Sequence, residues 1–155
     1  YRNYSEKYDE KKILKIKKFC KLNRLKFFLA NSVAIVNKLN LDGVYIPSFN
    51  RDLSSLKLKN KNIKIIGSAH NLKEISQKNK QGVELIFISP VFKINKSKNH
   101  LGVTKFNFLT KNIKCQTIAL GGINSKNIKK IKILNCSGIA SISFIKKYGK
   151  VNLIN

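Results

Sequence analysis

The chain has 155 residues, 43% of them hydrophobic, so one domain with a real core fits and two domains of ordinary size do not. Its formal net charge is +25, but lysines occur in almost every segment, and no basic cluster with interleaved aromatic residues marks a nucleic-acid-reading motif. We therefore expect no specific nucleic-acid partner, and a charge that favours phosphorylated small molecules.

Cysteine usage and hydropathy indicate the compartment. Cys20, Cys115 and Cys136 lack the spacing of metal ligands and cannot all pair with one another, so we expect buried, reduced thiols. No segment approaches the ~18 to 20 uninterrupted apolar residues of a membrane span, and no signal peptide is visible. The sequence predicts a cytoplasmic protein that does not bind membranes.

The first third of the chain predicts helices alternating with strands. Apolar residues recur among lysines after Glu10 with the spacing of an amphipathic helix that covers a sheet. Asp52 follows the second strand of this part and is placed to cap a short helix. In chain order, the expected elements are a helix over 10–22, a strand over 25–30, a short helix over 33–39, a strand over 42–46 and an exit loop over 47–52.

The rest of the chain contains four apolar runs, each ending in small, polar or glycine residues. Runs without polar alternation are typical of parallel strands covered on both faces. Asn71 is a plausible N-cap for the helix after the first run. The runs cover 63–70, 83–92, 116–123 and 138–143, the helices 72–79, 105–109 and a stretch from about Ser125, and a polar loop over 92–102 is long enough to act as a lid.

This alternation predicts an α/β fold, either a βα barrel or a doubly wound sheet, in one domain over residues 1–155. A complete eight-stranded TIM barrel typically needs about 250 residues, with roughly 200 as the usual lower end. The chain opens at Tyr1 without an initiator methionine, so we expect a TIM (βα)8-type barrel that lacks its first strand and helix and part of its second strand. In barrels the chemistry lies just past the carboxyl ends of the strands.

An ordered set of motifs resembles the family of thiamine phosphate synthases and thiazole tautomerases, which share a barrel fold. The resemblance covers nearly the whole chain, in family order and spacing. Its motifs are Asp42-Gly-Val-Tyr-Ile46, Gly67-Ser-Ala-His70, Ser89-Pro-Val-Phe92, Leu101-Gly102, Ala119-Leu-Gly-Gly-Ile123 and Gly138-Ile-Ala-Ser-Ile-Ser143.

The resemblance implies a synthase that joins hydroxymethylpyrimidine pyrophosphate to thiazole phosphate and releases pyrophosphate. Such chemistry needs neutralisation of a departing polyanion more than acid or base catalysis. By resemblance, the pyrimidine pyrophosphate contacts Arg2, Asn31, Ser68, Lys96 and Ser97. The thiazole phosphate is implied to bind at Gly122 and Ser143, in the usual phosphate site of the last two barrel loops.

The family binds magnesium through two aspartates, and this chain departs from that pattern. Ser32 and Asn50 stand at the two positions, although Mg²⁺ prefers charged oxygen ligands. Of the seven acidic residues, only Asp52 is placed to reach the barrel mouth. Two outcomes follow: lid lysines such as Lys93, Lys96 and Lys98 replace the charge of the metal, or the pyrophosphate chemistry is weak or absent.

His70 keeps an alternative activity open. In the tautomerases, which need no metal, a histidine in this loop is tied to a proton transfer, and an imidazole titrates near neutral pH. Synthases also carry a histidine here, so His70 does not separate the two activities. A member that binds phosphorylated ligands without turnover is the third interpretation.

Structural explanations compete with several of these assignments. The pair Gly121-Gly122 also suits a tight turn, because glycine tolerates positive φ. Ser68 and Ser143 also suit helix caps, and a solvated loop also accounts for the lysines of the lid.

Overall fold

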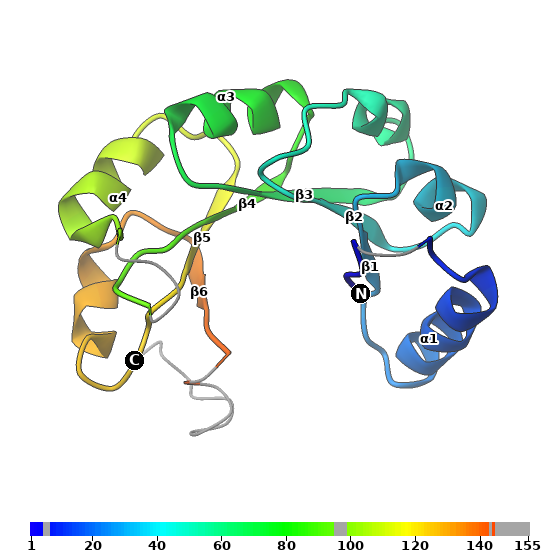
Figure 1. The fold of residues 1–155 in the computed structure, drawn as a ribbon, viewed down its shortest axis with the longest axis horizontal. Coiled ribbons are helices and arrows are strands. Elements are labelled where there is room, and N and C mark those ends of the chain that lie inside the picture. The colour runs from blue at the N-terminus through cyan, green and yellow to red at the C-terminus, as the bar shows by residue number, and fades with distance from the viewer. Residues whose placement is uncertain (5–6, 95–98, 143, 145–155) are drawn as a thin grey trace.

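In the part of the chain that the structure describes, six parallel strands form one sheet in the order β1-β2-β3-β4-β5-β6. The computed structural model describes residues 1–4, 7–94, 99–142 and 144. The sheet arches, and β1 and β6 form its two edges among the described strands (Figure 1). The strands are β1 (Phe28–Ala30), β2 (Gly43–Ile46), β3 (Lys64–Ala69), β4 (Leu85–Ile88), β5 (Gln116–Leu120) and β6 (Gly138–Ala140).

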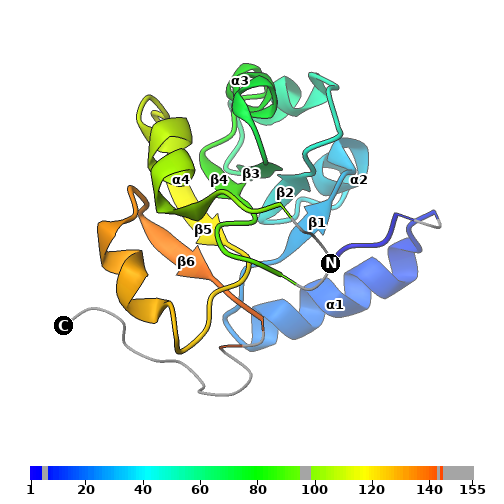
Figure 2. The same cartoon turned by 60° about the vertical axis from the view of Figure 1, so that its left-hand side comes forward.

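The helices lie on the convex side of the arch, so that strands and helices form two layers (Figure 1). Figure 2 shows the strands arranged side by side around an open concave side, as in part of a βα barrel. The helices are α1 (Glu10–Leu22), α2 (Val33–Lys38), α3 (Leu72–Lys80) and α4 (Gly102–Thr110), with two 3₁₀ helices, η1 (Ser54–Leu58) and η2 (Ile128–Ile133). This arrangement confirms the predicted α/β barrel class, in which parallel strands are joined through helices.

Side chains alternate between the two faces of the sheet. Those pointing toward the helices are buried, as at Leu29, Val44 and Ile86, each exposed by 0%. The intervening side chains point into the concave side, and several of them, as at Tyr45, Ile66 and Phe87, are only partly buried. The core therefore lies between the sheet and the helices, while the concave side carries an apolar lining.

One parallel bridge adjoins β1 on its outer side. The backbone nitrogen of Tyr1 donates to the Phe28 carbonyl at 2.7 Å, and the Ala30 amide donates to the Tyr1 carbonyl at 2.9 Å. This is the hydrogen-bond pattern of parallel neighbours. Arg2 therefore follows a sheet position, at the same rim as the carboxyl ends of the strands.

Most predicted elements are present with shifted ends. The helix predicted over 105–109 spans Gly102–Thr110, and the one expected from Ser125 is the 3₁₀ helix Ile128–Ile133. Asn71 caps α3 as predicted, because its side chain accepts from the Glu74 amide at 2.9 Å. Asp52 accepts from the Ser54 amide at 2.8 Å at the start of η1.

The three cysteines are only partly buried, whereas the sequence predicted buried thiols. Cys20, Cys115 and Cys136 are free thiols of intermediate burial. Among the residues described, no helix combines the length and the apolar character that crossing a bilayer requires.

Candidate functional site

Polar residues gather where the parallel strands end. Asn31 follows β1, the exit loop over 47–52 follows β2, His70 follows β3 and Ser89 follows β4. Because all six strands are parallel, these residues lie along one rim of the sheet. In barrels this rim carries the chemistry, and the sequence placed the site there.

A hollow of about 310 Å³ lies on the concave face next to Arg2, which lines it with Tyr45 and Phe87. The Arg2 guanidinium lies 5.8 Å from the centre of the Tyr4 ring. Ser68 borders this face, because the Tyr45 hydroxyl donates to its Oγ at 2.8 Å. The structure thus brings Arg2 and Ser68 to one face, and it assigns the cap of α3 to Asn71 rather than to Ser68.

A second cavity, of about 760 Å³, contains His70 with residues from three other segments. The His70 Nδ1 lies 2.6 Å from the Ser89 carbonyl oxygen. A carbonyl only accepts, so Nδ1 carries the hydrogen, and in the neutral imidazole the lone pair then lies on Nε2. His100 and Lys105 also line this cavity, and the Lys105 ammonium supplies a positive charge there.

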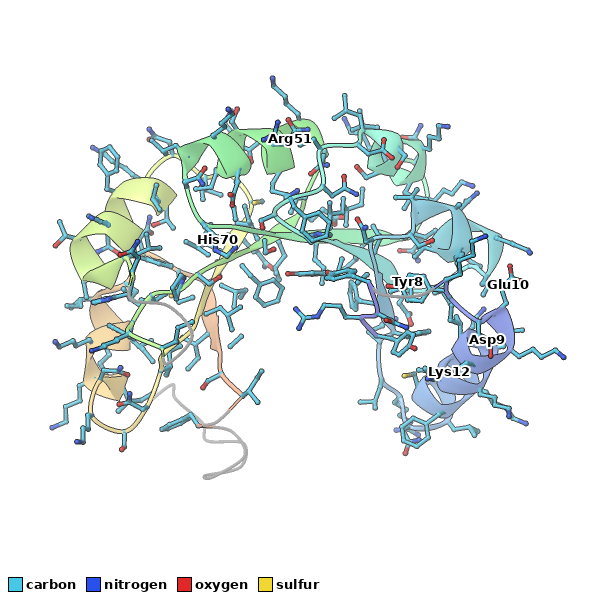
Figure 3. All side chains as sticks on the ribbon, in the orientation of Figure 1. Tyr8, Asp9, Glu10, Lys12, Arg51 and His70 are labelled. Carbon is cyan, nitrogen blue, oxygen red and sulfur yellow. The ribbon has the colours of Figure 1, made fainter. Side chains whose placement is uncertain are left out.

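The start of α3 holds His70 in place. The Glu74 carboxylate accepts from the His70 backbone amide at 2.7 Å and from the Asn71 side-chain amide at 3.0 Å. Figure 3 marks His70 at the strand-to-helix junction on the concave side of the arch. Hydrogen bonds therefore hold His70 at both its backbone amide and its imidazole ring.

Gly121 and Gly122 are required by the backbone around them. Both have positive φ, 98° and 73°, which favours glycine. A Cβ on Gly122 would lie 2.4 Å from the Phe92 carbonyl oxygen, and one on Gly121 would lie 3.0 Å from Pro90. The Phe92 amide donates to the Gly121 carbonyl at 3.1 Å, so the loops after β4 and β5 pack backbone to backbone. The tight-turn explanation thus holds at both positions, and it leaves phosphate binding by this turn as a further possibility to test.

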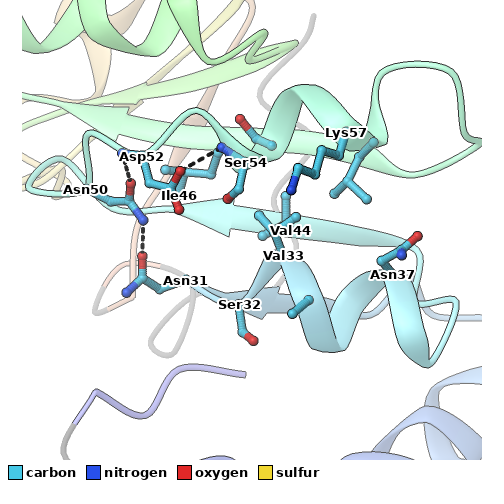
Figure 4. A pocket seen from close by; sticks show the side chains of 13 residues that line it. Asn31, Ser32, Val33, Asn37, Val44, Ile46, Asn50, Asp52, Ser54 and Lys57 are labelled. Carbon is cyan, nitrogen blue, oxygen red and sulfur yellow. Dashed lines mark hydrogen bonds between the residues drawn. The ribbon is translucent and has the colours of Figure 1, made fainter.

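Asn50, at one of the two positions where the resemblance implies an aspartate, is bonded to Asn31, the residue before Ser32 at the other position. The Asn50 side-chain amide donates to Asn31 Oδ1 at 2.6 Å, and the Asp52 backbone amide donates to Asn50 Oδ1 at 2.7 Å. Ser32 stands at the start of α2 and forms no capping bond there. Figure 4 shows these residues around a cavity of about 500 Å³ between α2 and η1.

This donor set does not fit magnesium. Asn31 Oδ1 and Asn50 Oδ1 both already accept hydrogen bonds, the first from the Asn50 NH₂ group and the second from the Asp52 amide. Asp52 is fully exposed; the Ser54 amide bonded to it is the main reason that its carboxyl pKa lies below the ordinary value. In the described part of the chain, no three His, Cys, Asp or Glu side chains cluster as metal ligands. Mg²⁺ prefers several charged oxygens, and among the described residues that line this cavity Asp52 alone has a carboxylate.

Three predicted site residues, Lys96, Ser97 and Ser143, lie outside the described residues. Ser141, which sequence reasoning did not single out, donates its hydroxyl to the Ile123 carbonyl at 3.3 Å between the ends of β5 and β6. The sequence analysis also missed Lys105 in the His70 cavity, because lysines are too common in this chain to stand out.

Fold and rim together define a class: a βα-barrel-type protein with a polar site at the carboxyl ends of its strands. The family profile described as "Thiamine monophosphate synthase" matches residues 1–145. A "Thiamine-phosphate synthase" of Prochlorococcus marinus subsp. pastoris is 33% identical over 136 residues, covering 86% of this chain and 39% of the relative. One of Fusobacterium nucleatum is 26% identical over 147 residues, covering 93% and 71%.

A solved structure, the thiamine phosphate pyrophosphorylase of Pyrococcus furiosus, superimposes with a TM-score of 0.68 at 21% identity, over 89% of this chain and 69% of that one. The chain belongs to the thiamine monophosphate synthase family, a family of transferases in thiamine biosynthesis. It spans about two fifths of the length of the Prochlorococcus marinus relative.

Proposed function

We propose that this chain carries the synthase site of its family and forms thiamine phosphate. The nitrogen of the thiazole phosphate supplies the electron pair of a new bond to the methylene carbon of the pyrimidine. The bond from that carbon to oxygen breaks, and pyrophosphate leaves with its electron pair. The reaction proceeds through charge stabilisation, which fits a chain of net charge +25.

Residue roles in this proposal follow the resemblance. Arg2, Asn31 and Ser68 bind the pyrimidine pyrophosphate, and the proximity of Arg2 to the face that Ser68 borders supports this assignment. Lys96 and Ser97 contribute from the loop after β4, and Gly122 and Ser143 hold the thiazole phosphate. The observation that carries the proposal is the family match over residues 1–145, combined with polar residues at the carboxyl ends of the strands.

The test is formation of thiamine phosphate from the two phosphorylated precursors by the full-length gene product. A Ser68→Ala variant should bind the pyrimidine pyrophosphate about tenfold more weakly, because hydrogen bonds to charged groups contribute about 1.5–3 kcal/mol. Ser76→Ala, at an exposed serine of α3, is the control and should bind normally. Equal losses in both variants would remove Ser68 from the site, and binding without product would favour the non-catalytic member.

The geometry of His70 favours a second candidate, the thiazole tautomerase. An Nδ1 bonded to the Ser89 carbonyl leaves Nε2 to remove a proton from the thiazole carboxylate phosphate and return it at another position. This activity should proceed without divalent ions, and His70→Ala should lose about 10²-fold or more of the rate. A His70→Ala variant with the full tautomerase rate would remove this candidate.

A further inference from the structure

A buried lysine stands behind the exit loop of β2. Lys78 of α3 is 0% exposed. Its ammonium donates to the Asn50 carbonyl at 2.8 Å and to Gln81 Oε1 at 2.7 Å. Burying an ammonium is expensive unless hydrogen bonds compensate for lost water, and here neutral oxygens do so. Desolvation lowers the pKa of Lys78 to about 8, and Glu74 on the same helix opposes this shift.

The sheet makes room for this side chain. A Cβ on Gly67 of β3 would lie 3.0 Å from Lys78 Cδ and 3.2 Å from the Ile46 carbonyl oxygen. The aliphatic stem of Lys78 therefore crosses β3 where the strand has no side chain. The buried lysine is part of how α3 packs on the sheet, and its head reaches the rim.

Three successive carbonyls of the exit loop accept from α3 and the residue after it. Lys78 and Gln81 Nε2 both donate to the Asn50 carbonyl, the latter at 3.1 Å. Gln77 donates to the Arg51 carbonyl at 2.9 Å, and Gln81 to the Asp52 carbonyl at 2.7 Å. Gln81 is itself fully buried, and the Ser55 hydroxyl donates to its backbone carbonyl at 2.8 Å. Side chains of α3 and Gln81 thus hold the backbone of residues 50–52, while the Asn50 side chain bonds Asn31.

We propose that Lys78 is a positioning residue, which with Gln81 holds residues 50–52 and the Asn50–Asn31 contact in place without a metal ion. An ammonium bound by two oxygens fixes the loop from inside the protein, at the position where the family's aspartate is replaced by Asn50. The part concerning ligand affinity rests on the proposed function; the part concerning the loop does not. This arrangement explains how the loop can keep its position although Asn31 and Asn50 do not fit magnesium.

The test compares amide hydrogen exchange in the full-length protein with that of Lys78→Met, which keeps a long apolar stem. Exchange of the Asp52 and Ser54 amides reports how firmly the loop is held, because these amides donate to the Asn50 and Asp52 side chains. Their exchange should rise about tenfold or more in Lys78→Met, since a hydrogen bond to a charged group contributes about 1.5–3 kcal/mol. Lys80→Met, at an exposed lysine of the same helix, should leave it unchanged. Magnesium or a chelator should not change wild-type exchange.

If Lys78→Met does not fold, Gln81→Met carries the same test, because it removes donors to two of the carbonyls. Unchanged loop exchange in the folded variant would overturn the proposal. A rise spread equally over the β-strand amides would do so too, since Lys78 would then stabilise the core without positioning the loop.

A second readout is the affinity for inorganic pyrophosphate, which should fall about tenfold in Lys78→Met and stay normal in Lys80→Met. If the wild-type protein does not bind pyrophosphate, the proposed function fails, and loop exchange still decides the role of Lys78. Normal pyrophosphate affinity with a loosened loop would overturn the link between loop and site.

Discussion

Gly122 shows how one residue at the rim constrains two loops. Its φ is 73°, and the Phe92 carbonyl oxygen would lie 2.4 Å from any Cβ added there. The neighbouring backbone cannot withdraw easily, because the Phe92 amide is bonded to the Gly121 carbonyl. The turn after β5 and the loop after β4 therefore constrain each other's backbone.

The Gly122→Ala variant should lose well over about 2 kcal/mol of unfolding free energy. The left-handed conformation alone contributes about 1–2 kcal/mol, and the collision adds to it. Gly82→Ala is the matched control, because Gly82 has a similar φ of 71° and its nearest neighbour is at an ordinary 3.5 Å. Denaturant unfolding of both variants measures the difference, and equal losses would show that the rim backbone yields.

Lys78 gives the molecule a pH dependence whose sign is opposite to that of a stabilising ion pair. Its pKa is about 8 in the folded protein, against the ordinary lysine value of 10.5 that applies to the unfolded chain. Between these values the unfolded chain binds more protons at this group, so its contribution to stability rises with pH. The gain is on the order of 3 kcal/mol when complete.

The expected result is that wild type gains stability relative to Lys78→Met as pH rises from about 8 to 10.5. Taking the difference between the two proteins removes the tyrosines and cysteines that titrate in the same range. Lys80→Met should follow the wild-type curve. Denaturant unfolding at several pH values measures this, and parallel curves for wild type and Lys78→Met would contradict the buried charge.

At the scale of elements, α3 links the fold to the site. Its cap, Asn71, binds the Glu74 amide, and Glu74 in turn accepts from the His70 amide. The N-terminus of α3 therefore fixes His70. Removing the cap should change both the stability of the helix and the environment of His70.

Replacing Asn71 by Ala should lower the free energy of unfolding by about 1 kcal/mol, the usual contribution of an N-cap side chain. Asp9→Ala, which removes the cap bond to Lys11 of α1, should show a similar loss of stability. Only Asn71→Ala should broaden or shift the His70 imidazole signals in NMR spectra. An unchanged His70 spectrum would mean that the cap and the site are independent.

Sequence patterns predicted the elements well where local signals are strong. The helix over 10–22 has its predicted ends, because Asp9 caps it and its apolar positions repeat with a helical period. The helix predicted from 105 begins at Gly102, whose positive φ follows from contacts with the β4 exit that no local pattern reveals. The helix predicted from about Ser125 is a 3₁₀ helix that begins at Ile128, and the Asn124 and Asn127 side chains before it bond the Gly122 carbonyl, a contact that no local pattern reveals.

At the scale of the whole molecule, the sequence located the site at the rim but not its internal bonds. Arg2, Asn31, Ser68 and His70 lie at or near the carboxyl ends of the strands, as parallel topology requires. The Asn31–Asn50 bond and the Lys78–Asn50 bond join residues 19 and 28 positions apart, which no spacing rule connects. One signal was present: Lys78 occupies an apolar position of α3, three residues after buried Ile75.

We propose that this family member releases pyrophosphate from its precursors although Ser32 and Asn50 stand where the resemblance implies two magnesium-binding aspartates. Pyrophosphate release from both phosphorylated precursors, measured on the full-length gene product with magnesium and with excess chelator, tests it directly. We predict the same rate of release in both solutions. Release that requires magnesium would contradict the claim, because a metal site would then exist that Asn31, Asn50 and Asp52 do not form.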